Sequence, residues 1–267
     1  MPKRAISPSS STSAAKKRSI ANGVALDAKK FRERLQSQGK YRDRKPGSSS
    51  LDGCLKDPPV LPPVVTVLGT KQAVPRRGAD GCFIFTDHPA FKPNLSPKEV
   101  LQLGSFGGTY YRDIVSAVTG EKYIGSKVIK EFPKDWFKGL VIEDAVCSPT
   151  YSKLANKYHS SCGASLGQWE SCGWISPLDP YGWFQWYCRF FMGRRTTDDE
   201  RQIDRWMKGQ GPTGRWRVRL CNDILKKKAK LDDMTTSPVL RQVLQHWAYR
   251  LTEADLERER VRQKNKK

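Results

Sequence analysis

The residues of this sequence best suited to chemistry are arginines that lie close to tryptophans between residues 168 and 219. Six of the eight tryptophans of the chain fall in this stretch. Large aromatic side chains predict a buried core, and the arginine guanidinium can donate paired hydrogen bonds to phosphate oxygens. We therefore expect an aromatic body that holds cationic side chains as candidates for phosphate binding: Arg194, Arg195, Arg201, Arg205, Arg215, Arg217 and Arg219.

Two further groups of basic residues extend this set of candidates. Lys226, Lys227 and Lys228 follow the arginines in a predicted helix. Arg112 follows the glycine-rich segment 104–108, which could present backbone N–H groups to a phosphate if a helix begins near Thr109. The alternative is a tight turn that lets the next two tyrosines pack, and the spacing matches neither a P-loop nor a dinucleotide-binding fingerprint.

Ion pairing inside the protein is the competing interpretation for the arginines. Arg201 and Arg205 share a predicted helical segment with Asp198, Asp199, Glu200 and Asp204, and exposed ion pairs contribute only about 0–1 kcal/mol. Arg215, Arg217 and Arg219 have no acid at adjacent positions. The sequence therefore favours phosphate contacts more strongly for these three.

Three other residues are candidates for catalysis on a nucleic-acid base. Glu170 lies among aromatic residues, where burial would raise the pKa of its carboxyl group and suit it to acid–base chemistry. Asp179 and Tyr111 complete this set of candidates, around a pocket that would stack a flipped base. The alternative for Glu170 is a carboxylate that caps or hydrogen-bonds the backbone.

The tripeptide Asp179-Pro180-Tyr181 resembles part of the water-activating motif of uracil-DNA glycosylases, Gly-Gln-Asp-Pro-Tyr-His. The resemblance implies a water-activating role for Asp179. It covers three residues, because Leu178 and Gly182 flank them here, and the mostly helical pattern differs from the α/β fold of that family. A helix N-cap followed by proline at the first helical position predicts the same tripeptide.

Metal and cofactor sites are not predicted. The seven cysteines include no CxxC pair, and the three histidines, His88, His159 and His246, are scattered. Structural zinc sites and metal-dependent hydrolases normally show closely spaced ligands. The predictions are therefore no metal and no cofactor.

The pattern of glycine, proline and capping residues predicts a mostly α, single compact multi-helix domain with an aromatic-rich core over residues 81–251. A charged C-terminal helix and tail follow over 252–267. Capping boxes are expected at Ser96, Thr197 and Thr252, and Gly193 should end the aromatic helix in a left-handed conformation. The expected helices of the second half span 180–192, 197–208, 215–228 and 237–251.

Charge is concentrated at the two ends of the chain. Lysines and arginines number 13 against 3 acids in residues 1–50, 17 against 16 in residues 51–200, and 18 against 8 in residues 201–267. Such basic ends are typical of a protein with a polyanionic partner. No apolar run reaches the roughly 18 residues of a membrane span, so no membrane association is predicted.

Residues 1–80 are predicted to be a disordered tail that is basic and rich in proline. Its basic clusters have the spacing of a two-part nuclear import signal, which predicts a nuclear location. An organellar transit peptide is the alternative, because serine is abundant and no acid precedes Asp27. The import-signal residues are Lys3, Arg4, Lys16, Lys17 and Arg18.

Together these patterns predict a nuclear nucleic-acid-binding protein that places arginine-rich helices on phosphates. Duplex DNA is favoured over RNA, and binding should weaken steeply with salt. The alternatives are an enzyme that acts on nucleic-acid bases and an interaction module in a larger nuclear assembly with unknown protein partners.

Overall fold

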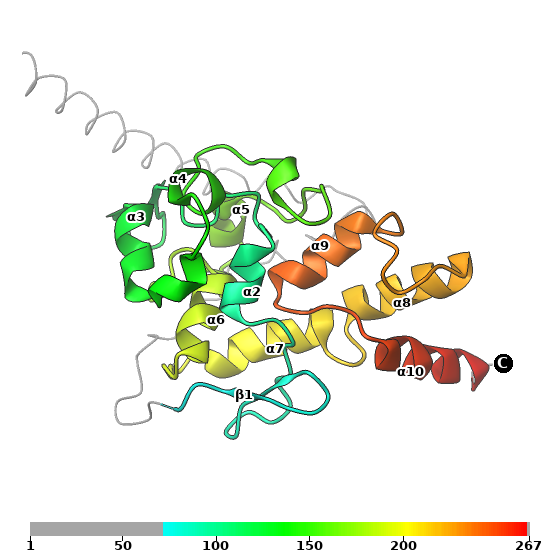
Figure 1. The fold of residues 1–267 in the computed structure, drawn as a ribbon. Helices are drawn as coiled ribbons and strands as arrows, with labels where there is room; N and C mark the ends of the chain where they lie inside the picture. Colours follow the sequence, from blue (N-terminus) through cyan, green and yellow to red (C-terminus); the bar gives the residue numbers. More distant parts are fainter. Residues whose placement is uncertain (1–71, 266–267) are drawn as a thin grey trace, which may run out of the picture.

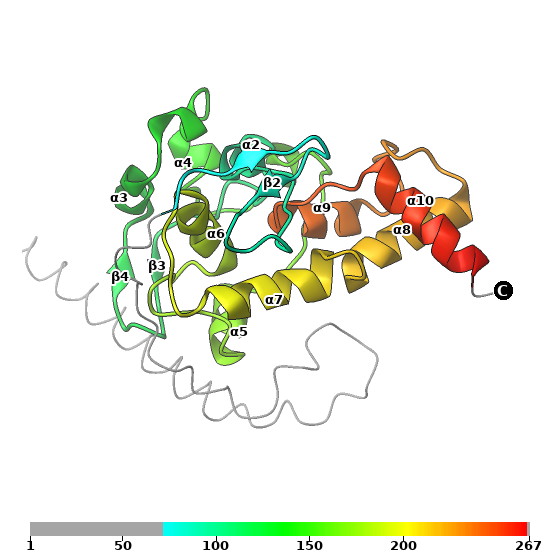
Figure 2. The ribbon, with the colours of Figure 1, turned by 90° about the horizontal axis from the view of Figure 1, so that it is seen from below.

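The structure of the chain, a computed structural model, describes residues 72–265. The predicted import signal and most of the predicted tail lie outside these residues. The described part is mostly helical, as predicted, with two short antiparallel pairs of strands. Figures 1 and 2 show small elements gathered at one end of the molecule and longer helices extending toward the other.

Helix α6, Trp183–Phe191, forms the centre of the core. Trp186 and Tyr187 have no exposed surface. Phe91, from a loop far away in the sequence, lies 5.9 Å from the ring of Trp186 and 5.1 Å from that of Trp206. The predicted aromatic core is therefore confirmed, and it joins segments from across the described chain.

The longer helices follow α6 in sequence and carry most of the predicted phosphate-binding arginines. Helix α8 packs against each of the other three, and α10 lies near the C-terminal end of the molecule (Figures 1 and 2). The helices are α7 (Asp199–Gln210), α8 (Arg215–Lys227), α9 (Pro238–His246) and α10 (Glu253–Lys264).

Short elements build the other end of the molecule. The helices are α2 (Pro97–Gln102), α3 (Gly125–Val128), α4 (Ile142–Ala145) and α5 (Leu166–Ser171), with 3₁₀ turns η2 (Ile129–Glu131), η3 (Lys134–Phe137) and η4 (Lys153–Ala155). Strand β1 (Arg76–Arg77) pairs with β2 (Phe83–Ile84), and β3 (Ile114–Val115) pairs with β4 (Lys122–Tyr123). No helix in residues 72–265 is long and apolar enough to cross a membrane.

The described structure includes residues on the N-terminal side of the predicted boundary near residue 81. Strand β1 pairs with β2, and Arg77 Nη2 lies 2.6 Å from the carboxylate of Glu99. The backbone N–H of Gln72 donates to the carbonyl oxygen of Gly193 at 2.9 Å. These partners are distant in sequence, so local composition could not identify them.

Two predicted helix starts differ from the structure. Helix α6 begins at Trp183 rather than Pro180, because Gly182 has a φ of +91° and closes a turn with the carbonyl of Asp179. The capping box predicted at Thr197 was wrong, because Asp198 is the N-cap of helix α7, which begins at Asp199. The carboxylate of Asp199 accepts hydrogen bonds from the backbone and hydroxyl of Thr196.

The predicted end of the fourth helix was also wrong. Helix α9 ends at His246, five residues before the expected end, and Ala248 follows with a φ of +55°. In contrast, the capping boxes at Ser96 and Thr252 are confirmed. The positive φ of +95° at Gly193, just after α6, is confirmed as well.

Candidate nucleic-acid interface

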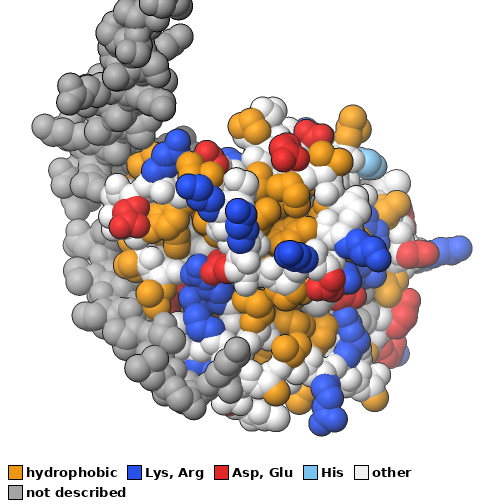
Figure 3. Space-filling view, turned by 60° about the vertical axis from the view of Figure 1, so that its left-hand side comes forward, with side chains coloured by type: hydrophobic (Ala, Val, Ile, Leu, Met, Phe, Trp, Pro, Cys, Tyr) orange, Lys and Arg blue, Asp and Glu red, His pale blue; other side chains and the backbone are white. Residues whose placement is uncertain are grey.

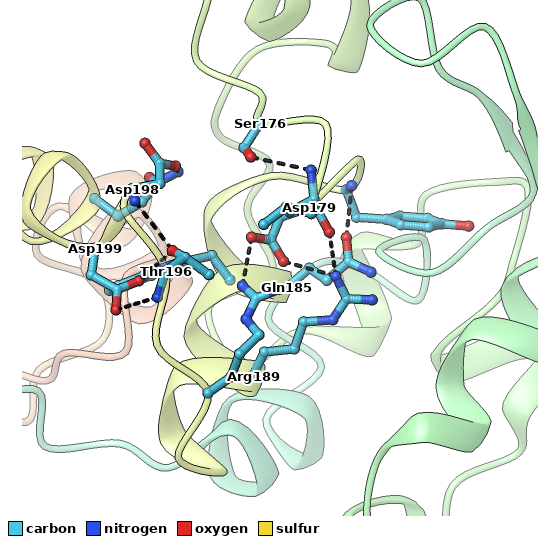
Figure 4. A network of polar contacts seen from close by, with 12 residues as sticks. Ser176, Asp179, Gln185, Arg189, Thr196, Asp198 and Asp199 are labelled. Carbon is cyan, nitrogen blue, oxygen red and sulfur yellow. Dashed lines mark hydrogen bonds and ion pairs between the residues drawn. The ribbon is translucent and has the colours of Figure 1, made fainter. Parts of the chain in front are cut away.

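Asp179 lies at the centre of a buried ion-pair network (Figure 4). Its carboxylate, with 1% of the side chain exposed, accepts from Arg189 Nη1 at 2.9 Å and from Arg194 Nη2 at 2.6 Å. Arg189 also pairs with Glu131 at 2.8 Å. Asp179 therefore does not cap α6, and neither its oxygens nor the paired end of Arg194 is free for a ligand.

Three more of the predicted arginines contact carboxylates inside the protein. Arg195 Nε lies 2.6 Å from Asp87, and Arg201 Nε lies 2.5 Å from Asp198. Arg217 pairs with Asp255, a carboxylate with 1% of its side chain exposed. Binding a phosphate at these arginines would require breaking an ion pair, which is costly when the remaining partner is buried.

The other predicted cations on α8 are more exposed. Arg219 pairs across the helix surface with Asp223 at 3.2 Å, and Arg215 lies over the ring of Trp216. Lys226, Lys227 and Lys228 are exposed near the end of the helix and have no ion pair among the described residues. These lysines remain available to a polyanion but lack aromatic neighbours that would hold them.

The remaining predicted arginine on α7, Arg205, has aromatic neighbours instead of a carboxylate. Its guanidinium lies 5.3 Å from the ring centroid of Trp174 and 5.4 Å from that of Trp247. It therefore differs from Arg201, one helical turn earlier, for which the expected pairing with Asp198 is found.

The other two catalytic candidates are buried in structural roles. The carboxylate of Glu170 accepts hydrogen bonds from Ala117 N at 2.8 Å and from the hydroxyl of Ser116 at 3.2 Å. Burial raises the pKa of Glu170, although these hydrogen bonds oppose the shift. Tyr111 has no exposed surface, and its hydroxyl contacts Cys188 Sγ. These hydrogen bonds from Ser116 and Ala117 to Glu170 stabilise the turn between β3 and β4.

A separate cavity of about 290 Å³ lies beside α5 and the end of α9, and we call it the aromatic pocket. This volume is close to the lower end of the roughly 300–1,000 Å³ typical of small-molecule sites. Its lining combines five aromatic rings and the imidazole of His246 with one cation, Arg112, and no carboxylate. The aromatic rings are those of Phe106, Tyr110, Tyr151, Trp169 and Tyr181.

The glycine-rich segment shapes this pocket, and some of its backbone N–H groups are used within the segment. The expected helix near Thr109 is absent, and the N–H groups of Gly107 and Thr109 donate to carbonyls within the segment. Gly107 has a φ of +57°, and a Cβ atom there would lie 2.7 Å from the ring of Tyr151. The glycine therefore lets Tyr151 lie against the backbone as one wall of the pocket.

Arg112 is the predicted cation that the fold directs into the aromatic pocket. Its Nη1 donates to the carbonyl oxygen of Thr109 at 3.1 Å, and it forms no ion pair among the described residues. The backbone oxygen of Arg112 accepts from the hydroxyl of Tyr181 at 2.8 Å. The guanidinium thus keeps several N–H donors for an anion.

Two titratable groups of the pocket, Cys162 and His246, are neutral near pH 7. Burial raises the pKa of Cys162 to about 12 and lowers that of His246 to about 4. Their contact at 3.6 Å therefore joins a thiol to a neutral imidazole, not a thiolate to an imidazolium. The pKa values of Tyr110 and Tyr151 are also raised by burial. Neither the thiol of Cys162 nor the imidazole of His246 has a pKa close to 7.

Sequence reasoning missed most of the pocket. Tyr151, Cys162, Ser165 and Trp169 line it together with His246, which lies between 77 and 95 residues further along the chain. The resemblance to glycosylases and the charge pattern directed attention to other residues. The available signal was the group of aromatic residues around Arg112, in a segment whose glycines permit close approach.

The surface charge does not form one continuous basic stripe on the face shown in Figure 3. Lysine and arginine side chains lie there in separate groups, with hydrophobic and acidic side chains between them. A duplex bound through many phosphates would require cations along an extended path. This face is better suited to a few local contacts.

Comparisons of the chain with protein-family models, curated proteins and solved structures find no match.

Proposed function

We propose that this protein binds nucleic acid by taking one unpaired nucleotide into the aromatic pocket. The observation that carries the proposal is the combination, in one cavity, of stacking surfaces with the uncompensated cation Arg112. Proteins that bind single strands use aromatic rings to stack bases and basic side chains to contact the backbone. The net charge of +21 supports a polyanionic ligand.

The donors of the pocket suit an anion with a planar base attached. Arg112 offers guanidinium N–H groups, and the indole N–H of Trp169 has no hydrogen-bond partner among the described residues. The hydroxyl of Ser165 is exposed and accepts only from Gln168 N. A phosphate beside Arg112 and a base beside Trp169 would use both kinds of group.

This proposal replaces the predicted contact of arginine-rich helices with duplex phosphates. Arg194, Arg195, Arg201 and Arg217 are committed to internal carboxylates. A base can enter the pocket only when it is unpaired and unstacked. We therefore expect single-stranded DNA to bind more tightly than the duplex. DNA is the first ligand to test, and a nuclear location stays a prediction.

The direct test is equilibrium binding of the full chain to a labelled single-stranded oligonucleotide and to the duplex of equal length. Base stacking contributes about 1–3 kcal/mol per base, so Trp169→Ala should weaken single-strand binding about 5- to 150-fold. Arg112→Gln should weaken it too. Arg260→Gln, which removes an exposed arginine paired with Glu257 on α10, is the matched control.

Equal affinity for single strand and duplex would contradict the proposal. So would single-strand binding that Trp169→Ala and Arg112→Gln leave at the level of the control. Far-ultraviolet circular dichroism of each variant separates a loss of binding from a loss of folding.

A further inference from the structure

Arg205 is an arginine without a carboxylate partner in a region where its neighbours have one. It lies on α7, where its Nη1 donates to the carbonyl oxygen of Trp174 at 3.2 Å and to Oε1 of Gln202 at 2.8 Å. Nearby Asp198 is already engaged, because Arg201 and the amide of Gln202 donate to its oxygens. Arg205 forms no ion pair among the described residues.

Holding Arg205 in this position has an electrostatic cost. Burial lowers the pKa of Arg205 to about 9, and the neighbouring charge of Arg201 adds to the shift. The two tryptophan rings offset part of the cost through cation–π attraction. Arg194, Arg195 and Arg217 are similarly removed from water, but each has a carboxylate within 4 Å. Asp198 opposes the shift only in part, because its carboxylate is paired with Arg201, so Arg205 stays available to an anion from outside the described residues.

Arg205 is only partly buried, and two of its donor groups are not used by the protein. Its Nε and Nη2 groups have no hydrogen-bond partner among the described residues, and both nitrogens keep some exposed surface. The indole N–H groups of Trp174 and Trp247 also have no hydrogen-bond partner among the described residues, and they too keep some exposed surface. By contrast, the indole N–H groups of Trp183, Trp186 and Trp206 in the core all donate hydrogen bonds.

This cluster of Arg205, Trp174 and Trp247 shares its supporting segments with the aromatic pocket. The backbone N–H of Trp174 donates to the carbonyl oxygen of Trp169 at 3.0 Å. Trp247 directly follows His246, whose ring lines the pocket. The two sites are therefore built from the same turn after α5 and the same end of α9.

We propose that Arg205, held over Trp174 and Trp247, is a second binding site that takes a phosphate of the bound strand as its counter-ion. The identity of the strand rests on the proposed function of the aromatic pocket. The planar guanidinium can donate two parallel hydrogen bonds to phosphate oxygens while its face stays against the rings. Lysine has the charge but not this geometry.

The test compares Arg205→Met and Arg205→Lys with wild type in the full chain. Arg205→Met removes a partly buried charge that has no carboxylate partner, but it also removes the hydrogen bonds to Trp174 and Gln202. These effects oppose each other, so the melting temperature should change less than in a variant that breaks a buried ion pair. Arg201→Met is the matched control: it leaves buried Asp198 without its ion-pair partner and should lower the melting temperature.

Binding is then measured with thymidine monophosphate and with single-stranded oligothymidine. Arg205→Met should weaken oligonucleotide binding by about tenfold or more, because hydrogen bonds to charged groups are among the stronger ones. Arg205→Lys should restore only part of it. Neither variant should change binding of the mononucleotide, which occupies only the pocket, whereas Arg112→Gln should weaken both ligands.

Two outcomes would overturn the inference. One is a fall in melting temperature for Arg205→Met like that of Arg201→Met, with oligonucleotide affinity unchanged, since Arg205 would then be structural. The other is equal weakening of mononucleotide and oligonucleotide by Arg205→Met, which would leave no second site.

A different pattern would separate this inference from the proposed function. If no nucleotide binds the pocket but inorganic tripolyphosphate raises the melting temperature of wild type and not of Arg205→Met, the anion site stands and the pocket proposal fails. If tripolyphosphate also has no effect on wild type, both proposals fail.

Discussion

At the scale of single residues, buried carboxylates decide which arginines can meet a ligand. Asp179 has no exposed surface and compensates Arg189 and Arg194 together. The sequence suggested two exposed roles for it, an N-cap and a water-activating group. Neither is compatible with a carboxylate whose two oxygens are held by guanidinium groups in the protein interior.

The first prediction follows from this network. Asp179→Asn should lower the free energy of unfolding by about 3–5 kcal/mol, because two arginines lose the charge that compensates them. Asp204→Asn is the control, since Asp204 pairs with Lys208 on the surface and should cost at most about 1 kcal/mol. Denaturant unfolding measures both values. A similar small cost for the two variants would contradict the structural role of Asp179.

The burial of His246 should make the free energy of unfolding depend on pH. Its ring stacks on Phe106 at 4.4 Å, and Nε2 contacts the carbonyl oxygen of Ser105. Burial lowers the pKa of His246 to about 4, against the opposing effect of that contact, whereas the unfolded value is about 6.5. Between these values only the unfolded chain takes up the proton. The stability contributed by His246 is complete above pH 6.5 and is lost as the pH falls toward 4.

The expected loss over this range is about 3 kcal/mol. It is measured by denaturant unfolding at pH 7 and pH 4.5, with His246→Gln as the comparison. The variant should lose less stability than wild type between the two pH values. Parallel behaviour of the two proteins would show that His246 does not take part in the titration.

At the scale of elements, glycine conformations determine where helices stop and which segments meet. Gly193 follows α6 with a φ of +95°, and a Cβ atom there would lie 2.0 Å from the carbonyl oxygen of Gln72. The sequence predicted the end of the helix at this glycine. It did not predict that the first described residues of the chain pack against it.

A comparison of two glycines tests this contact. Gly193→Ala combines an unfavourable backbone conformation with a clash against Gln72, and it should lower the free energy of unfolding by more than about 2 kcal/mol. Gly139 has a φ of +83°, but a Cβ atom there would have no neighbour within 4 Å, so Gly139→Ala should show the conformational cost alone, about 1–2 kcal/mol. Thermal unfolding of both variants gives the difference, and equal costs would argue against the close approach.

At the scale of the whole molecule, the number of phosphate contacts determines how strongly nucleic-acid binding depends on salt concentration. Each phosphate contact to a single strand contributes about −0.7 to the slope of log K against log salt concentration. Arg112→Gln and Arg205→Met should therefore each make the slope shallower by about 0.7. Arg194→Gln should leave the slope unchanged, since its partner is Asp179.

Titrations of the full chain at several salt concentrations measure these slopes. A large decrease in slope for Arg194→Gln would favour the original prediction, in which arginines of the long helices bind phosphates. Unchanged slopes for both Arg112→Gln and Arg205→Met would contradict the two proposed sites.

The sequence by itself determined the helical class, the aromatic core and two capping boxes, because periodicity, tryptophan content and caps act over a few residues. It also identified Arg112 and Arg205 among the candidate cations. Only the tertiary structure decided which cations have internal partners: Asp87 with Arg195 and Asp255 with Arg217 are 108 and 38 residues apart. It likewise joined Trp169 to His246 in one pocket. Charge neutralisation and concave surfaces depend on distances in space, which a linear pattern of residues does not specify.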